Sequence, residues 1–310
     1  MGIVNRVKNK FWTGQSKSIF VVTSNCQTHG IASSIDLMLP DSEAVPIWSL
    51  SGLDYVVEQI NSKIKGDFIW LTILNEVDRN AVIEKLAVKP SQVLSIPEIF
   101  FDAFHPDMTY VQLRNGELLE SALGHYHSKI ALWLYLNGVS TESAMKYFTG
   151  SIYMQLGYMG KHEISMAGLK NTIIGSGLDL ALFNETINHS DSFMHTFNHP
   201  KLKMLAALAE AACFKLGLIP TINHTEVDQV LRDVLFESGP IFPIYPEIAS
   251  YYGLEGSYLL RRQDGRVLTF PEFTSESFKI YARIKTDQFN PQSLFTQNFN
   301  DTMNEIVGAS

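Results

Sequence analysis

A regular alternation of short apolar runs with amphipathic stretches, between residue 18 and about residue 99, most constrains what this chain can fold into. The apolar runs predict four strands, at residues 18–23, 45–50, 68–74 and 92–96. The stretches between them predict three helices, at residues 31–39, 54–64 and 78–88. Strands that alternate with helices predict a parallel sheet with right-handed crossovers, and so the α/β fold class.

Two details place the strands and the ligand-binding edge of the expected sheet. The run at residues 68–74 is apolar on both faces, which is typical of a central parallel strand. Pro46 confines the second strand to an edge or makes it a strand start. Parallel sheets bind ligands outside the carboxyl ends of their strands. Cys26 follows the first strand and His105 follows the fourth, so both are candidates for a site at that edge.

Beyond Tyr110 the strand signal fades and helical patterns take over. Helices are predicted at residues 128–136, 140–148, 178–187, 200–216 and 225–236. Three prolines in residues 239–252 predict an ordered loop around the body. We therefore expect an N-terminal extension (1–17) and one catalytic unit (18–310). Within that unit, a small α/β part (18–115) precedes a mainly helical part (116–310) that covers the catalytic edge.

Charge and missing motifs exclude several classes of protein. A net charge of -8 argues against a duplex nucleic-acid binder, which carries a basic face. No run of roughly 18 apolar residues predicts a membrane span, and the basic residues near the N-terminus precede no apolar signal region. The expected location is therefore cytoplasmic. There is no Gly-x-Gly-x-x-Gly after the first strand, no Walker phosphate loop and no Gly-x-Ser-x-Gly, which argues against the corresponding enzymes.

The two cysteines lie in different surroundings. Cys213 falls in an apolar helix and is expected to pack in the core. Cys26 lies in the strand-to-helix turn 24–27 (SNCQ), where a helix dipole lowers a thiol pKa and main-chain N–H groups face a developing oxyanion. A buried structural cysteine fits the position equally well. Cys26 and His29 have no second metal-ligand pair, so no metal is expected and His29 is assigned to the helix surface.

Two histidines, His105 and His199, directly precede prolines. Pro106 holds His105 extended, and Asp107 could orient its imidazole; the alternative is a turn in which Asp107 caps the next segment. Pro200 suits the first position of a helix, which makes His199 its cap and keeps the imidazole neutral, as a general base requires. Simple helix capping explains His199 as well.

The segment 124–129 (GHYHSK) brings donors, a cation and an aromatic ring to a helix start. Such a segment can bind a phosphate or an adenine, and it can equally be a polar loop. Lys129 and Lys201 are, by themselves, ordinary surface lysines.

Taken in order, these segments resemble the WcbI family of polysaccharide-biosynthesis enzymes. The matching segments are 24–27 (SNCQ), 104–107 (FHPD) with Tyr110, 126–128 (YHS), 138–140 (GVS), 195–200 (HTFNHP) and 243–249 (PIYPEIA). The similarity spans residues 19–281. One departure is Ser24, where the family pattern leads us to expect glycine and a more permissive turn.

The resemblance implies coenzyme A binding and acetyl transfer from acetyl-coenzyme A to a sugar hydroxyl of a capsular or exopolysaccharide or its precursor. It implies a small parallel sheet of SGNH or flavodoxin-like type. The catalytic residues it suggests are Cys26, His199, His105 and Asp107. The residues for the oxyanion or substrate are Asn25, Gln27 and Asn198. The coenzyme-binding residues are Ser24, Tyr126, His127, Ser128, Lys129 and Lys201.

Several alternatives stay open from the sequence. Cys26 could carry the acetyl group covalently, or His105 or His199 could activate the sugar hydroxyl for direct transfer. An SGNH-like esterase with a cysteine nucleophile, and a non-catalytic ligand-binding subunit of a polysaccharide assembly complex, are the competing functions. The sequence does not name the acceptor sugar, and a homo-oligomer is among the oligomeric states it allows.

Overall fold

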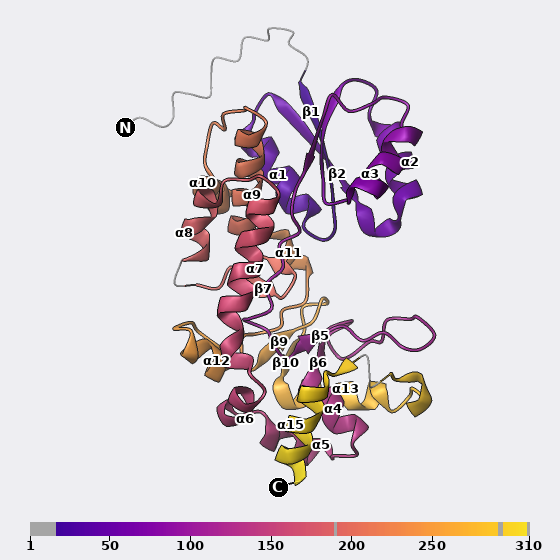
Figure 1. The fold of residues 1–310 in the computed structure, drawn as a ribbon, viewed down its shortest axis with the longest axis vertical. Helices are drawn as coiled ribbons and strands as arrows, with labels where there is room; N and C mark the ends of the chain where they lie inside the picture. The colour runs from indigo at the N-terminus through magenta and orange to yellow at the C-terminus, as the bar shows by residue number, and fades with distance from the viewer. Residues whose placement is uncertain (1–16, 189–190, 291–293, 309–310) are drawn as a thin grey trace.

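The computed structural model describes residues 17–188, 191–290 and 294–308 (Figure 1). Residues 1–16, which make up nearly all of the expected N-terminal extension, lie outside the described residues. In Figure 1 the α/β part forms one end of the molecule, and the late helices form the other end.

The predicted parallel sheet is confirmed. Its strands are β1 (Ser18–Ser24), β2 (Ser42–Trp48), β3 (Phe68–Thr72) and β4 (Gln92–Ser95). They pair in parallel in the order β2-β1-β3-β4, the order in which a flavodoxin-like sheet begins. β2, with Pro46, lies at an edge, and β3 lies inside the sheet, as the sequence predicts.

Helices cover both faces of this sheet because alternate strand residues point to opposite sides. Phe20 and Val22 join the core cluster that includes residues of α1 (Thr28–Met38), whereas Val21 joins the cluster beneath α2 (Leu53–Lys63) and α3 (Glu76–Lys85). The sheet is therefore doubly wound, and its carboxyl edge faces the remainder of the chain.

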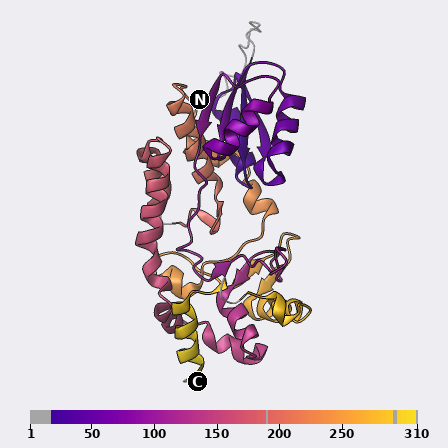
Figure 2. The same ribbon diagram turned by 45° about the vertical axis from the view of Figure 1, so that its right-hand side comes forward.

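The remainder is mainly helical, as predicted. Its α-helices are α4 (Lys129–Leu136), α5 (Thr141–Ala144), α6 (Gly150–Gln155), α7 (Lys161–Gly175), α8 (Asn184–Ile187), α9 (Leu202–Lys215), α10 (His224–Val230), α11 (Val234–Ser238), α12 (Pro246–Tyr251), α13 (Phe270–Tyr281) and α15 (Gln297–Gly308). The 3₁₀ helices are η1 (Ser49–Ser51), η2 (Met145–Tyr147), η3 (Tyr158–Gly160), η4 (Leu180–Phe183) and η5 (Thr286–Gln288). The long helix α7 runs along one side of the molecule in Figure 2.

Several boundaries differ from the prediction. The helix expected at 225–236 is two helices, because Asp233 accepts a hydrogen bond from Phe236 N–H and starts α11 as a separate element. The loop expected at 239–252 ends in α12, with Pro246 in its first turn. Helices α7, α13 and α15 were not predicted.

Strand pairs also occur beyond Tyr110, where the pattern predicted none. They are the antiparallel pairs of β5 (Met108–Thr109) with β6 (His127–Ser128), β7 (Met194–Thr196) with β8 (His199–Pro200), and β9 (Leu259–Arg261) with β10 (Val267–Thr269). Two or three residues are too few to show an alternation of period two, so the sequence pattern could not reveal them.

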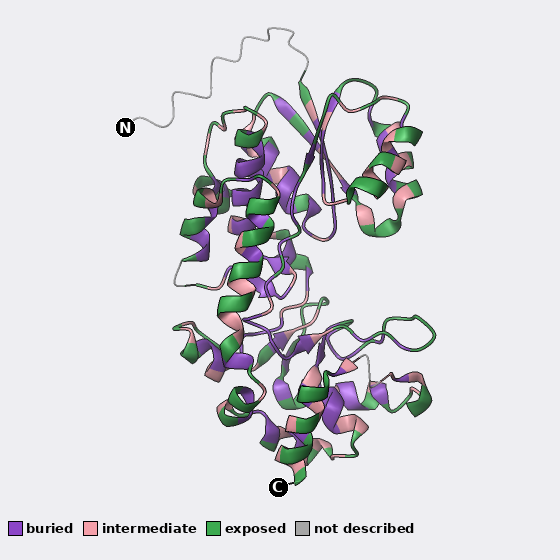
Figure 3. Cartoon of the chain, viewed as in Figure 1, coloured by how far each residue is buried: buried purple, intermediate pink, exposed green. Residues whose placement is uncertain are grey.

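Helix α9 is buried along most of its length and packs on α1 (Figure 3). A Cβ atom at Gly30 would lie 2.4 Å from the Cδ1 atom of Leu205, so glycine allows the two helices this close approach. Cys213 is buried in α9, which confirms its predicted place in the core.

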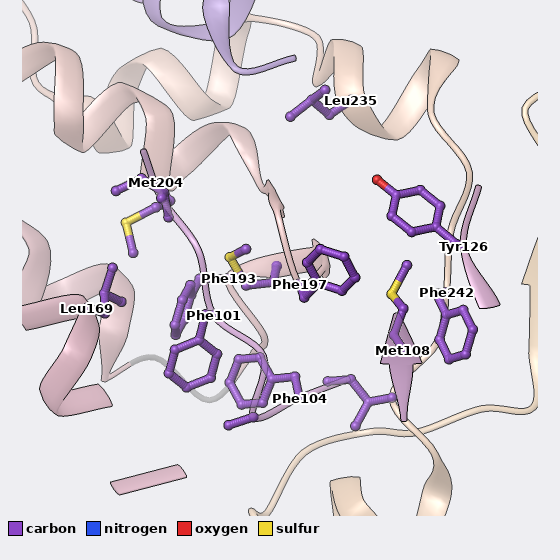
Figure 4. Close-up of a cluster of buried hydrophobic side chains, with 14 of the residues drawn as sticks. Phe101, Phe104, Met108, Tyr126, Leu169, Phe193, Phe197, Met204, Leu235 and Phe242 are labelled. Carbon is purple, nitrogen blue, oxygen red and sulfur yellow. The ribbon is translucent and has the colours of Figure 1, made fainter. Parts of the chain in front are cut away.

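An aromatic cluster fills the space between the sheet and the late strand pairs (Figure 4). The ring of Phe101 lies 4.7 Å from that of Phe104 and 4.9 Å from that of Phe193. Phe197 packs edge-on against Tyr126 at 5.8 Å. This packing fixes the loops that carry the candidate site residues.

Candidate functional site

Cys26 lies in the turn between β1 and α1, as predicted, and its side chain is half-buried. Its sulfur lies 3.7 Å from Asn25 Oδ1 and 3.9 Å from the main-chain oxygen of Asn198, which belongs to the β7–β8 turn. The structure thus brings together two segments separated by more than half the chain. The departure at Ser24 does not strain the turn, because Ser24 still belongs to strand β1 and no described non-glycine residue has a positive φ.

The neighbours of Cys26 hold the turn in place. Gln27 donates from Nε2 to the Ile99 carbonyl (2.8 Å) and accepts from the Ile99 N–H (3.1 Å). The Gln27 N–H donates to Asn25 Oδ1 (3.0 Å), and Asn25 Nδ2 donates to Glu98 Oε1 (2.6 Å). The Gln27 N–H and the Asn25 amide therefore already have partners, which differs from the oxyanion role expected for them.

Burial and, to a smaller extent, the nearby Glu98 carboxylate together raise the pKa of the Cys26 thiol to about 12. The expected lowering of this pKa by a helix dipole is therefore wrong: desolvation and a negative neighbour outweigh the dipole. At neutral pH the side chain is a thiol. Burial also raises the pKa of Glu98, although the hydrogen bond from Asn25 opposes this shift.

A hydrogen-bonded group of polar side chains adjoins the cysteine. Tyr126 Oη lies 2.9 Å from Asn198 Oδ1 and 3.1 Å from His199 Nε2. Asn198 Nδ2 donates to the Tyr110 hydroxyl (2.9 Å), and Thr196 Oγ1 donates to Asn198 Oδ1 (3.0 Å). Tyr110 and Tyr126 stack with their centroids 5.2 Å apart. We call Cys26, Asn198, Tyr126 and His199 the turn cluster.

His199 is not a helix cap, so that prediction is wrong. It belongs to β8, its N–H donates to Thr196 Oγ1 (3.1 Å), and Lys201 is the residue before α9. The strand pairing of residues 194–200 carries the chain two residues further before the helix begins. Burial lowers the pKa of His199 to about 4, with a smaller effect from His195, so the imidazole is neutral near pH 7, as predicted, although the cause differs. Its Nδ1 is buried without a hydrogen-bond partner among the described residues.

His105 and Asp107 do not join the turn cluster through any contact of the described residues. His105 is fully buried and packs on the Phe242 ring at 6.3 Å; burial lowers its pKa to about 3. The Asp107 carboxylate accepts from the Ile130 N–H (3.0 Å) and from the hydroxyls of Tyr158 (3.0 Å) and Tyr245 (2.6 Å). Asp107 therefore does not orient an imidazole, because other donors hold its carboxylate.

Most residues suggested for the coenzyme have structural partners instead. His127 is buried between the Tyr281 hydroxyl (2.8 Å) and the Leu119 carbonyl (3.1 Å), and Ser128 caps α4 by accepting from the Ala131 N–H. Lys129 donates to the Pro106 carbonyl (2.8 Å), and burial lowers its pKa. Burial likewise lowers the pKa of Lys201. The buried Ser24 Oγ has no partner among the described residues.

Glu98 and Tyr110 are not among the catalytic, substrate or coenzyme residues expected from the sequence. Glu98 follows β4 at the same sheet edge as Cys26, so the rule that ligands bind at strand ends could have found it. Asp233, which accepts from His195 Nε2 (2.8 Å) and from the Leu202 N–H (2.9 Å), gave no local signal. The pairing joins residues far apart in sequence.

A cleft of about 590 Å³ opens beside the turn cluster. It is lined by Tyr110, which hydrogen-bonds Asn198 of the cluster, by residues 120–126, which include Tyr126, and by residues 262–264 of the β9–β10 turn. A volume of this size suits a small organic ligand. Within the described part of the chain, no group of three or more acidic, histidine or cysteine side chains could bind a metal ion.

The buried histidines predict how stability depends on pH. The pKa values of His105, His127 and His199 are lowered to about 3, 4 and 4, whereas unfolded histidine titrates near 6.5. The unfolded chain therefore binds more protons below about pH 6.5, and stability falls as the pH drops toward the folded values. We expect a loss of about 2 kcal/mol per histidine at pH 5, measured by urea denaturation.

Two variants test this pH dependence. His127→Gln should remove about a third of the loss between pH 7 and pH 5, whereas a substitution of the exposed His29 should leave it unchanged. An unchanged pH dependence in His127→Gln would contradict the assignment.

The fold and the cluster together define a class: a doubly wound α/β protein with an enzyme-like polar site at the carboxyl ends of its strands. The chain belongs to the WcbI family, since the model of "Polysaccharide biosynthesis enzyme WcbI" matches residues 19–221. This confirms the resemblance found in the sequence. The protein is thus a member of a family of polysaccharide-biosynthesis enzymes.

A solved structure shares the fold. It is described as native WcbI, a novel polysaccharide biosynthesis enzyme, without a disulfide bond between coenzyme A and a cysteine of that protein. The two chains are 14% identical, the alignment covers 94% of this chain and 95% of that chain, and the TM-score is 0.62. A comparison with curated proteins gives no match. Among the helices of the described residues, none has the length and apolar character needed to cross a membrane.

Proposed function

We propose that this protein is an O-acetyltransferase that moves the acetyl group of acetyl-coenzyme A to a hydroxyl of a polysaccharide or its sugar precursor. The observation that carries the proposal is the turn cluster, in which a neutral histidine, a tyrosine hydroxyl and a cysteine thiol meet beside a cleft. Membership of the WcbI family supports a role in polysaccharide biosynthesis. Because acetyl-coenzyme A is the proposed donor, we propose that the protein acts in the cytoplasm. We also propose that residues 18–310 act as one catalytic unit.

Direct transfer fits the cluster better than a covalent acetyl-cysteine. The Cys26 thiol has a raised pKa, and its hydrogen-bond partners in the described chain are two carbonyl-type oxygens rather than a base. A thiol without an adjacent base is a poor nucleophile, because the thiolate is the reactive form. His199 is preferred to His105 as the base, since only His199 connects to the cluster.

The proton path follows the contact between Tyr126 Oη and His199 Nε2, once the Tyr126 hydroxyl, which donates to Asn198 Oδ1 in the structure, turns to donate to the imidazole. Tyr126 takes the proton of the sugar hydroxyl while its own proton passes to His199 Nε2, 3.1 Å away. The sugar oxygen then bonds to the acyl carbon, and the carbon–sulfur bond of the thioester breaks. His199 returns the proton to the departing sulfur. Burial raises the pKa of Tyr126 far above neutral pH, so the tyrosine relays a proton and does not persist as phenolate.

Cys26 is the residue we assign to the sulfur end of the coenzyme. The chain has two cysteines, and Cys213 is buried in α9, so Cys26 is the one a ligand can reach. The related WcbI structure is described in terms of a cysteine and coenzyme A, which supports this assignment.

Coenzyme A is therefore expected to raise the melting temperature of the protein, because a ligand that binds only the native state stabilises it. At a concentration about 100 times its Kd, the gain is about 2.7 kcal/mol. Differential scanning fluorimetry with coenzyme A and acetyl-coenzyme A measures the shift. Cys213→Ser is the matched control for Cys26→Ser.

The same variants separate direct from covalent transfer. Cys26→Ser should keep acetyl transfer within about tenfold of the wild type, since the thiol is not the nucleophile. Mass spectrometry of the wild type mixed with acetyl-coenzyme A should find no acetyl group on the Cys26 peptide. A stoichiometric adduct there would replace direct transfer with the covalent route, and the absence of any coenzyme A shift would reject the proposed function.

A further inference from the structure

The cleft beside the turn cluster has walls of two different kinds. Residues 120–126 form a tight, hydrogen-bonded loop, in which Ser121 N–H donates to the Gly124 carbonyl (2.6 Å) and Ser121 Oγ to the Tyr126 carbonyl (2.5 Å). The Ala122 N–H donates to Ser277 Oγ of α13 (3.2 Å). The loop is therefore held in place by contacts of its own and by α13, and it presents a preformed wall.

The β9–β10 turn also lines the cleft, and its cation, Arg262, is neutralised. The Arg262 guanidinium lies 3.2 Å from an Asp264 oxygen and 3.6 Å from a Glu276 oxygen. Glu120 adds a carboxylate to the first wall. Glu120 and Asp264 each carry a negative charge and Arg262 carries a positive one. The charged groups that line the cleft therefore sum to a negative charge.

This charge disfavours the coenzyme as the occupant. Coenzyme A carries several phosphate charges, and negative potential in a cleft lowers the local concentration of an anion. An uncharged polyol meets no such penalty. Its hydroxyl groups can donate to the carboxylates of Glu120 and Asp264 and accept from Gln263, which also lines the cleft.

An aromatic platform stands where the cleft meets the turn cluster. Tyr110 is 40% exposed and stacks on Tyr126, and both line the cleft. An exposed tyrosine ring supplies apolar area with a polar edge, which matches the apolar C–H face and the hydroxyl rim of a pyranose. The Tyr126 hydroxyl is also the group in contact with His199.

We infer that this cleft is the acceptor subsite and that it takes a neutral pyranose, with the reactive hydroxyl directed to Tyr126. The inference rests on the proposed function, which requires a sugar acceptor, and adds its location and its charge class. The coenzyme then approaches from Cys26, which is not among the residues that line the cleft.

Saturation-transfer NMR with the methyl glycosides of glucose, galactose and mannose tests the inference. Wild-type protein should transfer saturation to these glycosides, and should transfer less to methyl glucuronide because of the carboxylates. Gln263→Trp, at an exposed position of the turn, should fill the cleft and abolish the signal. Gln297→Trp, exposed on α15 outside the cleft, is the matched control and should keep it.

Glu120→Trp fills the cleft from the other wall, so a folding defect in one variant does not decide the outcome. The coenzyme A melting shift should be the same in all these proteins. No glycoside signal with wild type, a signal that survives both cleft variants, or a coenzyme A shift lost in them would overturn the inference. Failure of the wild type to bind coenzyme A would instead reject the proposed function.

Discussion

Replacing His199 with glutamine is expected to lower kcat for acetyl transfer by about 10²- to 10⁴-fold, the usual contribution of a general base. Glutamine can still hydrogen-bond the Tyr126 hydroxyl, which lies 3.1 Å from His199 Nε2, but it cannot hold the proton. The burial that lowers the pKa of His199 to about 4 makes the native imidazole a neutral acceptor near pH 7. Release of free coenzyme thiol in steady state measures the loss.

His127→Gln is the matched control, because His127 is also buried but bonds the Tyr281 hydroxyl and the Leu119 carbonyl. It should reduce stability and leave the kcat of the folded protein unchanged. Tyr126→Phe should reduce kcat as His199→Gln does, since the relay needs both groups. Full activity in His199→Gln would remove the base from the mechanism. Full activity in Tyr126→Phe, with activity lost in His199→Gln, would keep His199 as the base and remove Tyr126 from the proton path.

The sequence predicted the α/β part well because its signals are local and repeated. Strands β1, β2 and β3 each have four or more apolar or β-branched residues, and Pro46 correctly put β2 at an edge. The position of Cys26 followed from the same pattern, since a parallel sheet exposes the turns after its strands on one edge. The antiparallel strand pairs were not predicted, because each of their strands has only two or three residues.

Only part of the site could be predicted from the sequence. The physical reason for each missing part differs from residue to residue. His199 and Tyr126 lie close together because β7 and β8 turn back on themselves, which no helical pattern predicts. The pKa of Cys26 was predicted with the wrong sign, since Glu98 and burial depend on tertiary packing. His105 and Asp107 lie within the family-like segment 104–107, yet their side chains are buried and do not join the turn cluster.

Asp107 provides the second large expected effect. Replacing it with alanine should lower the free energy of unfolding by at least about 4.5 kcal/mol, because three buried donors lose one acceptor and each such bond contributes about 1.5–3 kcal/mol. The donors are the Ile130 N–H at the start of α4 and the hydroxyls of Tyr158 and Tyr245. Urea denaturation, followed by far-UV circular dichroism, measures the change.

If Asp107 instead oriented a catalytic histidine, its replacement would mainly lower kcat and would have little effect on stability. Both Asp107 oxygens are engaged, Oδ1 by Ile130 and Tyr158 and Oδ2 by Tyr245, and none of these donors is an imidazole. Tyr158→Phe and Tyr245→Phe should each cost a part of the Asp107→Ala loss while kcat of the folded protein stays near that of the wild type. An Asp107→Asn protein with native stability and a kcat lowered 100-fold or so would show instead that the carboxylate acts in catalysis.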